Sequence, residues 1–93
     1  MIQSFRHPES ERIFRGQRSR RLPNDIQEAA RRKMRYLHQA LVLNDLRVPP
    51  GNRLEALAGD RQGQYSIRIN DQWRICFIWG SHGPEQVEIV DYH

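Results

Sequence analysis

Apolar residues in the first half of the chain recur at the spacing of one helical face. They are Ile26, Ala30, Met34, Leu37 and Leu41. Side chains three or four positions apart lie on the same side of a helix, so this stripe is expected to face a core. Pro23 and Asn24, which come just before it, are residues that commonly start helices. The pattern therefore predicts a helix from about Asn24 to Leu41.

Shorter elements are expected on either side of this helix. The opening residues Met1–Arg6 alternate in a way that predicts a short strand. Pro8 begins a short helix that runs to Arg15 and ends at Gly16. A turn around Asn44–Leu46 follows the long helix. The prolines in Val48–Gly51 then end the helical half, because proline lacks an amide donor.

In the second half of the chain the period of the pattern changes to two. Apolar and polar residues alternate in Gln64–Asn70, Trp73–Trp79 and Gln86–Tyr92. Asn70-Asp71 marks a turn between the first two segments, and Gly80–Pro84 forms the next loop. Three strands joined by short turns predict an antiparallel meander.

The alternation gives the predicted sheet two unlike faces. One face is apolar and consists of Tyr65, Ile67, Ile69, Trp73, Ile75, Phe77 and Trp79. The opposite face carries Arg68 and Arg74. Because only the long helix can cover the apolar face, we expect an α+β fold in a single domain over residues 1–93, a small antiparallel sheet packed on one face by N-terminal helices. The stretch Arg53–Leu57 is too short to assign.

Charge adds a second level of organisation. The 93 residues include 15 Lys and Arg against 11 Asp and Glu, a formal net charge of +4. All but one of the basic residues are arginines, whose planar guanidinium suits phosphate and carboxylate groups better than the ammonium of lysine does. The excess lies in residues 1–35, with ten basic and four acidic residues, whereas the rest of the chain is net negative.

Eight arginines form a peripheral set that could contact a nucleic acid or a partner protein: Arg12, Arg15, Arg18, Arg20, Arg21, Arg31, Arg32 and Arg35. A cluster of this kind is typical of a nucleic-acid contact. An acidic protein partner would fit it equally well. The first five arginines are also compatible with a solvated, mobile loop, because Gly16, Gln17 and Ser19 offer little to bury.

Several kinds of site are excluded by what the chain lacks. Cys76 is the only cysteine, which excludes an internal disulfide framework and a thiol-rich zinc site. The four histidines are scattered and no glycine-rich phosphate loop occurs, so we expect neither a metal nor a cofactor. No apolar run is long enough to cross a membrane and no signal peptide opens the chain. These features fit a reducing, cytoplasmic location.

The residues best suited to acid–base chemistry are Asp91, Tyr92 and His93. A carboxylate, a phenol and an imidazole can take up and release protons, as the cleavage of a phosphodiester requires. The alternative is a frayed tail, which is common at a chain end. Val87 and Ile89 count against fraying, because they anchor the last strand almost to its end.

Arg68 and Arg74 are expected to lie side by side on the polar face of adjacent strands. Two guanidinium groups at that place could hold a phosphodiester. The alternative is that they pair with Glu55 or Glu88, or point into solvent, as arginines on strands often do.

Motifs spread along the chain match one family. They are Met1–Phe5, Pro49–Leu57, Gly59-Asp60-Arg61, Gln64–Asn70 with Trp73-Arg74-Ile75, and the terminal Asp91-Tyr92-His93. With these motifs the sequence resembles the HigB toxins, and among them the GraT-like branch, of the RelE/ParE superfamily of type II toxin–antitoxin modules.

The resemblance implies a fold like the one expected above and a specific activity. Relatives of this kind are endoribonucleases that cut mRNA in the decoding site of the ribosome. The implied partners are the ribosome with its mRNA and a HigA-like helix-turn-helix antitoxin, so that operator DNA would be reached only through the antitoxin.

Matched residue by residue, Asp91, Tyr92 and His93 correspond to the catalytic group of the family. Arg74 corresponds to an arginine that binds the scissile phosphate. The chain departs from some members at Glu55, where they have a catalytic histidine, and at Ala58, where they have a lysine.

These departures shift the expected roles of neighbouring residues. We expect Glu55, Arg61 and Arg68 to take part in RNA or phosphate binding. The expected reaction is metal-free: the 2′-hydroxyl attacks the adjacent phosphorus while His93 or Asp91 assists proton transfer. Tyr92 would orient the groups or protonate the leaving oxygen, and Arg74 would stabilise the developing charge.

Two other functions are compatible with the sequence. The chain could be a DNA gyrase poison, as ParE-like members are, although a gyrase poison has no evident use for the Asp-Tyr-His terminus. It could also be a toxin that binds the ribosome or rRNA without cutting it, which the missing histidine at position 55 favours.

Overall fold

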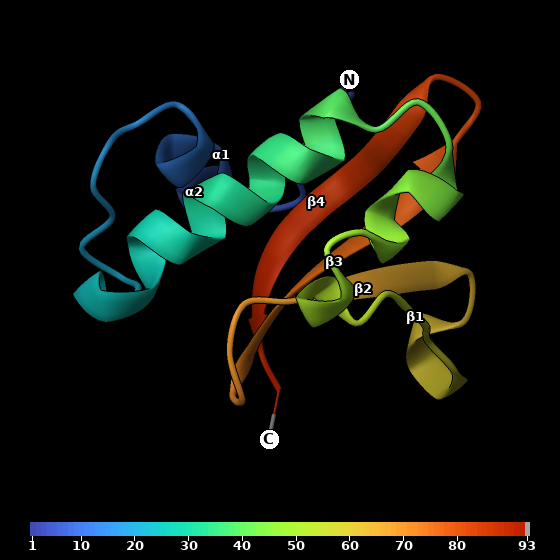
Figure 1. Ribbon diagram of the computed structural model, residues 1–93. Coiled ribbons are helices and arrows are strands. Elements are labelled where there is room, and N and C mark those ends of the chain that lie inside the picture. The colour runs from blue at the N-terminus through green and yellow to red at the C-terminus, as the bar shows by residue number, and fades with distance from the viewer. Residues whose placement is uncertain (93) are drawn as a thin grey trace.

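The computed structural model describes residues 1–92, and His93 lies outside them. Within the described residues, helices α1 (Pro8–Phe14) and α2 (Asn24–Gln39) pack on one face of a four-stranded antiparallel sheet (Figure 1). The strands are adjacent in the order β1 (Glu55–Ala56), β2 (Gln64–Arg68), β3 (Trp73–Gly80) and β4 (Gly83–Asp91). Short 3₁₀ turns occur at Leu43–Arg47, Pro50–Asn52 and Gly59–Arg61. The predicted α+β fold is confirmed.

Helix α2 begins where the sequence predicted and ends two residues earlier than expected. Its C-terminal neighbour Ala40 is extended, and the side chain of Leu41 is 87% exposed. The carboxylate of Asp45 explains this end, because it accepts hydrogen bonds from the backbone N–H of Leu41 at 2.9 Å and of Val42 at 3.2 Å. Those bonds start the following 3₁₀ turn in place of another helical turn.

The register of the sheet confirms the predicted two-sided pattern. Ile67 lies opposite Ile75 and Tyr65 opposite Phe77 across β2 and β3. Both isoleucines and Phe77 are fully buried and share one core cluster with the apolar stripe of α2. Each such side chain contributes about 1.5–3 kcal/mol when it is buried. On the other face, Arg68 lies opposite Arg74.

The opening segment forms less of a strand than the sequence predicted. It makes a single parallel bridge, between Phe5 and Val87 of β4. Toward the N-terminus the N–H of Gln3 still donates to the carbonyl oxygen of Pro84 at 2.8 Å, whereas the N–H of Ile2 turns away from β4 and donates to Nδ1 of His38 on α2. Pro84, on the facing strand, has no N–H to offer. The sequence stretch left unassigned, Arg53–Leu57, instead contains the edge strand β1.

Asn52 holds the segment between α2 and β1 in place. Its side chain is fully buried and donates to the carbonyl oxygens of Leu46 at 3.1 Å and Val48 at 3.4 Å, while its own oxygen accepts from Nζ of Lys33 at 2.7 Å. Burial, together with the charges of Arg32 and Arg68, lowers the pKa of Lys33. One amide therefore satisfies two carbonyls and one ammonium group.

Replacing Asn52 by alanine should leave these groups without a partner. We expect Asn52→Ala to lower the free energy of unfolding by about 2–3 kcal/mol, as measured by urea denaturation. The matched control is Asn44→Ala, an exposed asparagine whose side chain, within residues 1–92, accepts only from Arg47, for which we expect a change within about 0.5 kcal/mol. Equal effects of the two substitutions would contradict the role given to Asn52.

Cys76 should be unreactive in the folded protein. Its side chain is fully buried, and this burial raises the pKa of the thiol, so little thiolate is present and little reagent reaches it. We expect a disulfide reagent to leave the native protein unmodified at mildly alkaline pH and to label one thiol per chain in guanidinium chloride. Rapid labelling of the native protein would show that the strand opens.

Candidate functional site

The polar face of the sheet brings together residues that are far apart in the sequence. Glu55 lies opposite Ser66, Ser66 opposite Cys76, and Cys76 opposite Glu88, a row that crosses all four strands. In the neighbouring row Arg74 lies opposite Val90. Because side chains alternate along a strand, Glu88, Val90 and then Tyr92 follow one another on the face that carries Arg74.

The guanidinium of Arg74 is held in a fixed orientation. Its Nε donates to Oγ of Ser66 at 2.8 Å, and Nη2 donates to the carbonyl oxygen of Arg53 at 2.7 Å. Arg53 presents that carbonyl from a left-handed backbone conformation with φ of 46°. A guanidinium has five N–H donors, so these two contacts leave others available to a ligand.

Arg61 approaches the same face from the 3₁₀ turn before β2. Its Nη1 donates to Oε1 of Gln64 at 3.0 Å and to Oε2 of Glu88 at 3.2 Å. Burial acts to lower the pKa of Arg61, but the hydrogen bond and charge of Glu88 outweigh it and the pKa is raised. Arg61 is therefore a permanent cation whose position is set by Glu88, a side chain that is only 16% exposed.

An open pocket of about 540 Å³ lies at the end of β4. Arg61, Val90, Asp91 and Tyr92 line it. Tyr92 is 40% exposed, and the centre of its ring lies 5.8 Å from the guanidinium carbon of Arg74. A phenol, a carboxylate and the guanidinium of Arg61 thus meet at the pocket, and the guanidinium of Arg74 lies beside the phenol ring.

The backbone and side-chain contacts of Gln72 tether this end of β4. Its carbonyl oxygen accepts from the N–H of Tyr92 at 2.6 Å, and its Nε2 lies 3.2 Å from both carboxylate oxygens of Asp91. The strand is therefore held through Tyr92, in contrast to the frayed tail considered for Asp91 and Tyr92. His93 lies outside the described residues.

Two of the residues expected to bind phosphate lie away from the pocket. Arg68 is beside Arg74 in the register, but its guanidinium donates to the carboxylate of Asp71 in the β2–β3 turn. Glu55 is exposed on β1. It stands at one end of the row that crosses the four strands, and Glu88 stands at the other end. Ala58 precedes the turn that carries Arg61, and its carbonyl oxygen accepts from the N–H of that arginine.

The peripheral arginines differ in how they are held. Arg15 pairs with Glu11 at 2.8 Å, whereas the side chains of Arg32 and Arg35 are exposed and form no hydrogen bond or ion pair within residues 1–92. Arg31 was expected on the outward face of α2, but it is partly buried and its Nε donates to the carbonyl oxygen of Ile13 at 2.8 Å. Arg31 therefore ties α2 to the end of α1.

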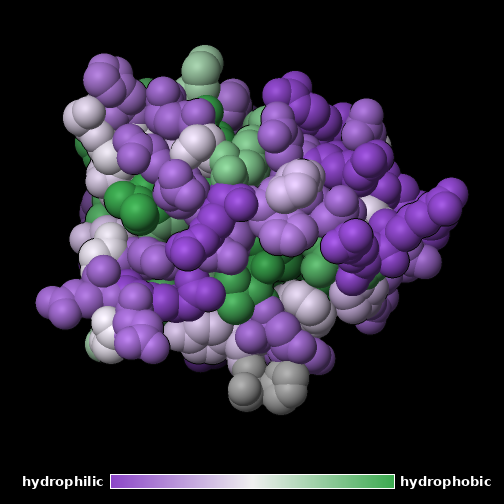
Figure 2. All heavy atoms as spheres, turned by 180° about the vertical axis from the view of Figure 1, so that it is seen from behind, coloured by the Kyte–Doolittle hydropathy of each residue, from purple (hydrophilic) through white to green (hydrophobic). Residues whose placement is uncertain are grey.

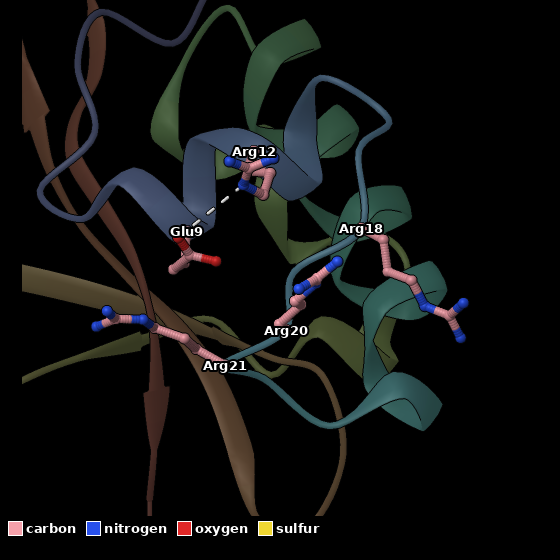
Figure 3. A pocket seen from close by; sticks show the side chains of 5 residues that line it. All are labelled: Glu9, Arg12, Arg18, Arg20 and Arg21. Atoms are coloured by element: carbon pink, nitrogen blue, oxygen red, sulfur yellow. Dashed lines mark ion pairs between the residues drawn. The ribbon is translucent and has the colours of Figure 1, made fainter.

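The remaining four peripheral arginines lie together. Arg12, Arg18, Arg20 and Arg21 line a second pocket with Glu9 (Figure 3). The loop that carries most of them is not loosely solvated, because Ser19 is buried, contrary to what the sequence suggested.

Sequence reasoning missed several residues that shape the site. Glu88 was considered only as a partner that would neutralise arginines, although alternation from Tyr92 places it on the same face. Ser66 was likewise on that face without an assigned role. No pattern in the sequence predicts the contacts of the Arg53 carbonyl and of the Gln72 side chain, because these contacts depend on how distant turns fold.

Among residues 1–92, no three His, Cys, Asp and Glu side chains are placed so that they could hold a metal ion. The same part of the chain contains no helix that is long and apolar enough to cross a membrane.

Seen from behind, the molecule is mainly hydrophilic, and apolar residues show as small areas between polar ones (Figure 2).

Comparison with known proteins places the chain in a family. Residues 3–93 match the family model described as RelE-like toxin of type II toxin-antitoxin system HigB. A protein called Toxin HigB-1 from Vibrio cholerae serotype O1 is 47% identical over 62 residues, which cover 67% of this chain and 65% of that protein. An uncharacterised protein of Haemophilus influenzae is 35% identical over 57 residues, which cover 61% of this chain and 56% of that protein.

The fold has a solved counterpart. A chain of the YoeB-YefM complex from Staphylococcus aureus superposes with a TM-score of 0.61 at 17% identity, over 100% of this chain and 98% of the other. This likeness supports the fold alone, whereas the family rests on the match over nearly the whole sequence. The chain belongs to the HigB family of RelE-like toxins of type II toxin–antitoxin systems.

Proposed function

We propose that this toxin is an endoribonuclease that cuts mRNA on the ribosome. The observation that carries the proposal is the pocket at the end of β4, where Tyr92 and Asp91 lie beside Arg61, and the fixed guanidinium of Arg74 faces the ring of Tyr92. Two oriented cations next to acid–base groups suit a phosphodiester, whose charge increases as it is attacked.

The proposed reaction is an internal transesterification of RNA. The 2′-oxygen bonds to the adjacent phosphorus as the bond from phosphorus to the 5′-oxygen breaks. The products are a 2′,3′-cyclic phosphate and a 5′-hydroxyl. His93 or Asp91 takes the proton of the 2′-hydroxyl, and Tyr92 orients the leaving oxygen or gives it a proton. Arg74 and Arg61 stabilise the charge that develops on the phosphate oxygens.

The positions of the arginines refine the roles expected from the sequence. Arg61 lines the pocket and Arg74 lies beside the ring of Tyr92, so we assign phosphate binding to both. Arg68 donates to Asp71, so it contributes charge to the face and no direct contact to the phosphate at the pocket. Glu55 is exposed on β1, and we propose that its carboxylate accepts hydrogen bonds from ribose hydroxyls of the RNA rather than binding phosphates.

We further propose that a HigA-like helix-turn-helix antitoxin neutralises the toxin. The family to which the chain belongs is named for a toxin–antitoxin system, which supports a partner of this kind. Contact with operator DNA would then be made by the antitoxin and not by this chain.

The function is tested by incubating the purified protein with a defined mRNA, with and without ribosomes, and mapping the ends by primer extension. We expect breaks inside codons only when ribosomes are present, with 5′-hydroxyl ends and no cleavage at positions that carry 2′-deoxyribose. Inhibited translation of intact mRNA would favour the non-catalytic toxin. Double-strand breaks in DNA incubated with gyrase would favour the gyrase poison.

Removing single acid–base groups should lower cleavage while the fold survives. We expect Tyr92→Phe and His93→Gln to lower the single-turnover rate by about 100- to 10,000-fold, the range of general acid–base catalysis. The ring of Tyr92→Phe still faces Arg74, so thermal unfolding should be nearly unchanged. Tyr36→Phe on α2 is the matched control. Near-normal cleavage by both variants would remove these residues from the mechanism.

Glu88 should act through Arg61. We expect Glu88→Gln to lower cleavage about tenfold, because Arg61 loses the charged partner that sets its position. Glu85→Gln, on the same strand, is the matched control and should cleave normally. In an Arg61→Gln background the Glu88 substitution should have no further effect. Additive losses would show that Glu88 acts on the substrate independently.

A further inference from the structure

A second pocket lies between α1 and the loop that leads to α2. The arginine pocket, formed by Glu9, Arg12, Arg18, Arg20 and Arg21, has a volume of about 350 Å³. Figure 3 shows Glu9 and Arg12 coming from α1 and the other three side chains from the loop that leads to α2. Four guanidinium groups and one carboxylate give this pocket a strong positive charge.

Most of that charge is not neutralised within the described residues. Glu9 lies 4.0 Å from Nε of Arg12, and Nε of Arg18 donates to the side-chain oxygen of Asn24 at 3.1 Å. Arg20 and Arg21 are exposed and have no side-chain partner in residues 1–92. Two cations are thus available to an anion from outside.

Hydrogen bonds to side chains of α1 and α2 hold the loop that carries these arginines in place. The side-chain amide of Gln27 on α2 grips the backbone of Ser19 from both sides: its oxygen accepts from the Ser19 N–H at 3.0 Å, and its Nε2 donates to the Ser19 carbonyl at 2.8 Å. The same Nε2 donates to the carbonyl of Leu22 at 2.9 Å. Both Gln27 and Ser19 are buried.

The hydroxyl of Ser19 makes two further hydrogen bonds that hold the loop. It donates to Oε1 of Glu9 at 2.6 Å and accepts from the backbone N–H of Arg21 at 3.1 Å. The residues on both sides of Ser19 are therefore fixed in position relative to α1 and α2. A loop that is already ordered loses less conformational freedom when it binds a ligand, which raises its affinity.

We propose that the arginine pocket is a preorganised binding site for phosphate groups, separate from the candidate active site. Guanidinium forks match the oxygens of a phosphate in geometry as well as charge, and several of them can share one phosphate. The carboxylate in the pocket is engaged by Ser19 and Arg12, so it anchors the loop, while Arg20 and Arg21 remain exposed. The site goes beyond the proposed nuclease activity and does not depend on it.

The site is tested with a short single-stranded RNA whose sugars are 2′-O-methylated, because such a probe cannot be cut by the proposed reaction. Binding is followed by fluorescence anisotropy at fixed ionic strength. We expect Arg20→Gln to weaken binding about tenfold, and to reduce the slope of log affinity against log salt by about 0.7. Arg47→Gln, which removes one exposed arginine outside the pocket, should weaken it no more than about twofold. Equal losses would mean that only overall charge matters and would overturn the proposal.

The contribution of the Gln27 hydrogen bonds to phosphate binding is tested without changing any charge. Gln27→Met keeps a similar side-chain volume but removes all three hydrogen bonds to the loop, and we expect it to weaken binding about fivefold with an unchanged salt slope, the loss that a more mobile loop would bring. Gln39→Met, exposed at the end of α2, is the matched control. Wild-type affinity in a folded Gln27→Met protein would show that the site is not preorganised. If that variant does not fold, the comparison of Arg20 with Arg47 still decides whether the pocket binds the probe.

Competition then identifies the source of the phosphate. Displacement of the RNA by pyrophosphate or ATP at equal phosphate concentration would point to free polyphosphates, whereas resistance to both would point to a polynucleotide backbone. A glutamate-rich peptide that binds more tightly than the RNA, with the same loss in Arg20→Gln, would overturn the assignment to phosphate. Because the probe is not cleaved, failure of this site leaves the cleavage experiment unaffected.

Discussion

The position of β3 between its two neighbours is the constraint on which the rest of the structure depends. Ile75 and Phe77 must face the helices, because nothing else buries them. Since side chains alternate, Arg74 and Cys76 must then face the other way. A slip of one residue would place the guanidinium of Arg74 in the core and expose Phe77. Hydrophobic burial on one side of the sheet thereby fixes the electrostatics on the other side.

This dependence explains how much could be predicted. The long helix and the three longer strands follow local periodicity, which is present in the sequence itself, and so does the face on which Arg74 lies. Contacts between distant segments are not present in it. Arg61 meets Glu88 across 27 positions, and Arg74 meets a carbonyl at Arg53 that only a left-handed turn presents. The site's chemical groups could therefore be predicted, whereas the groups that orient them could not.

Errors in the sequence-based expectations have the same physical origin. Ser19 is small and polar, so its surroundings gave no reason to expect burial, yet Gln27 satisfies both polar groups of its backbone. Arg31 continues the polar stripe of α2, but the carbonyl oxygen of Ile13 at the end of α1 accepts from its Nε as well as from the N–H of Gly16. A buried polar group costs little once it is hydrogen-bonded, and periodicity cannot show where a partner will be.

The contact between the opening segment and β4 has a consequence for synthesis of the protein. The N–H of Gln86 donates to the hydroxyl of Ser4, 82 positions away, and Val87 bridges to Phe5. Chains emerge from the ribosome with the N-terminal part first, and β4 follows every other described helix and strand. The contacts of Ser4 and Phe5 with β4 therefore form only after β4 has been made. The pocket at the end of β4 likewise cannot form while that strand is still inside the ribosome.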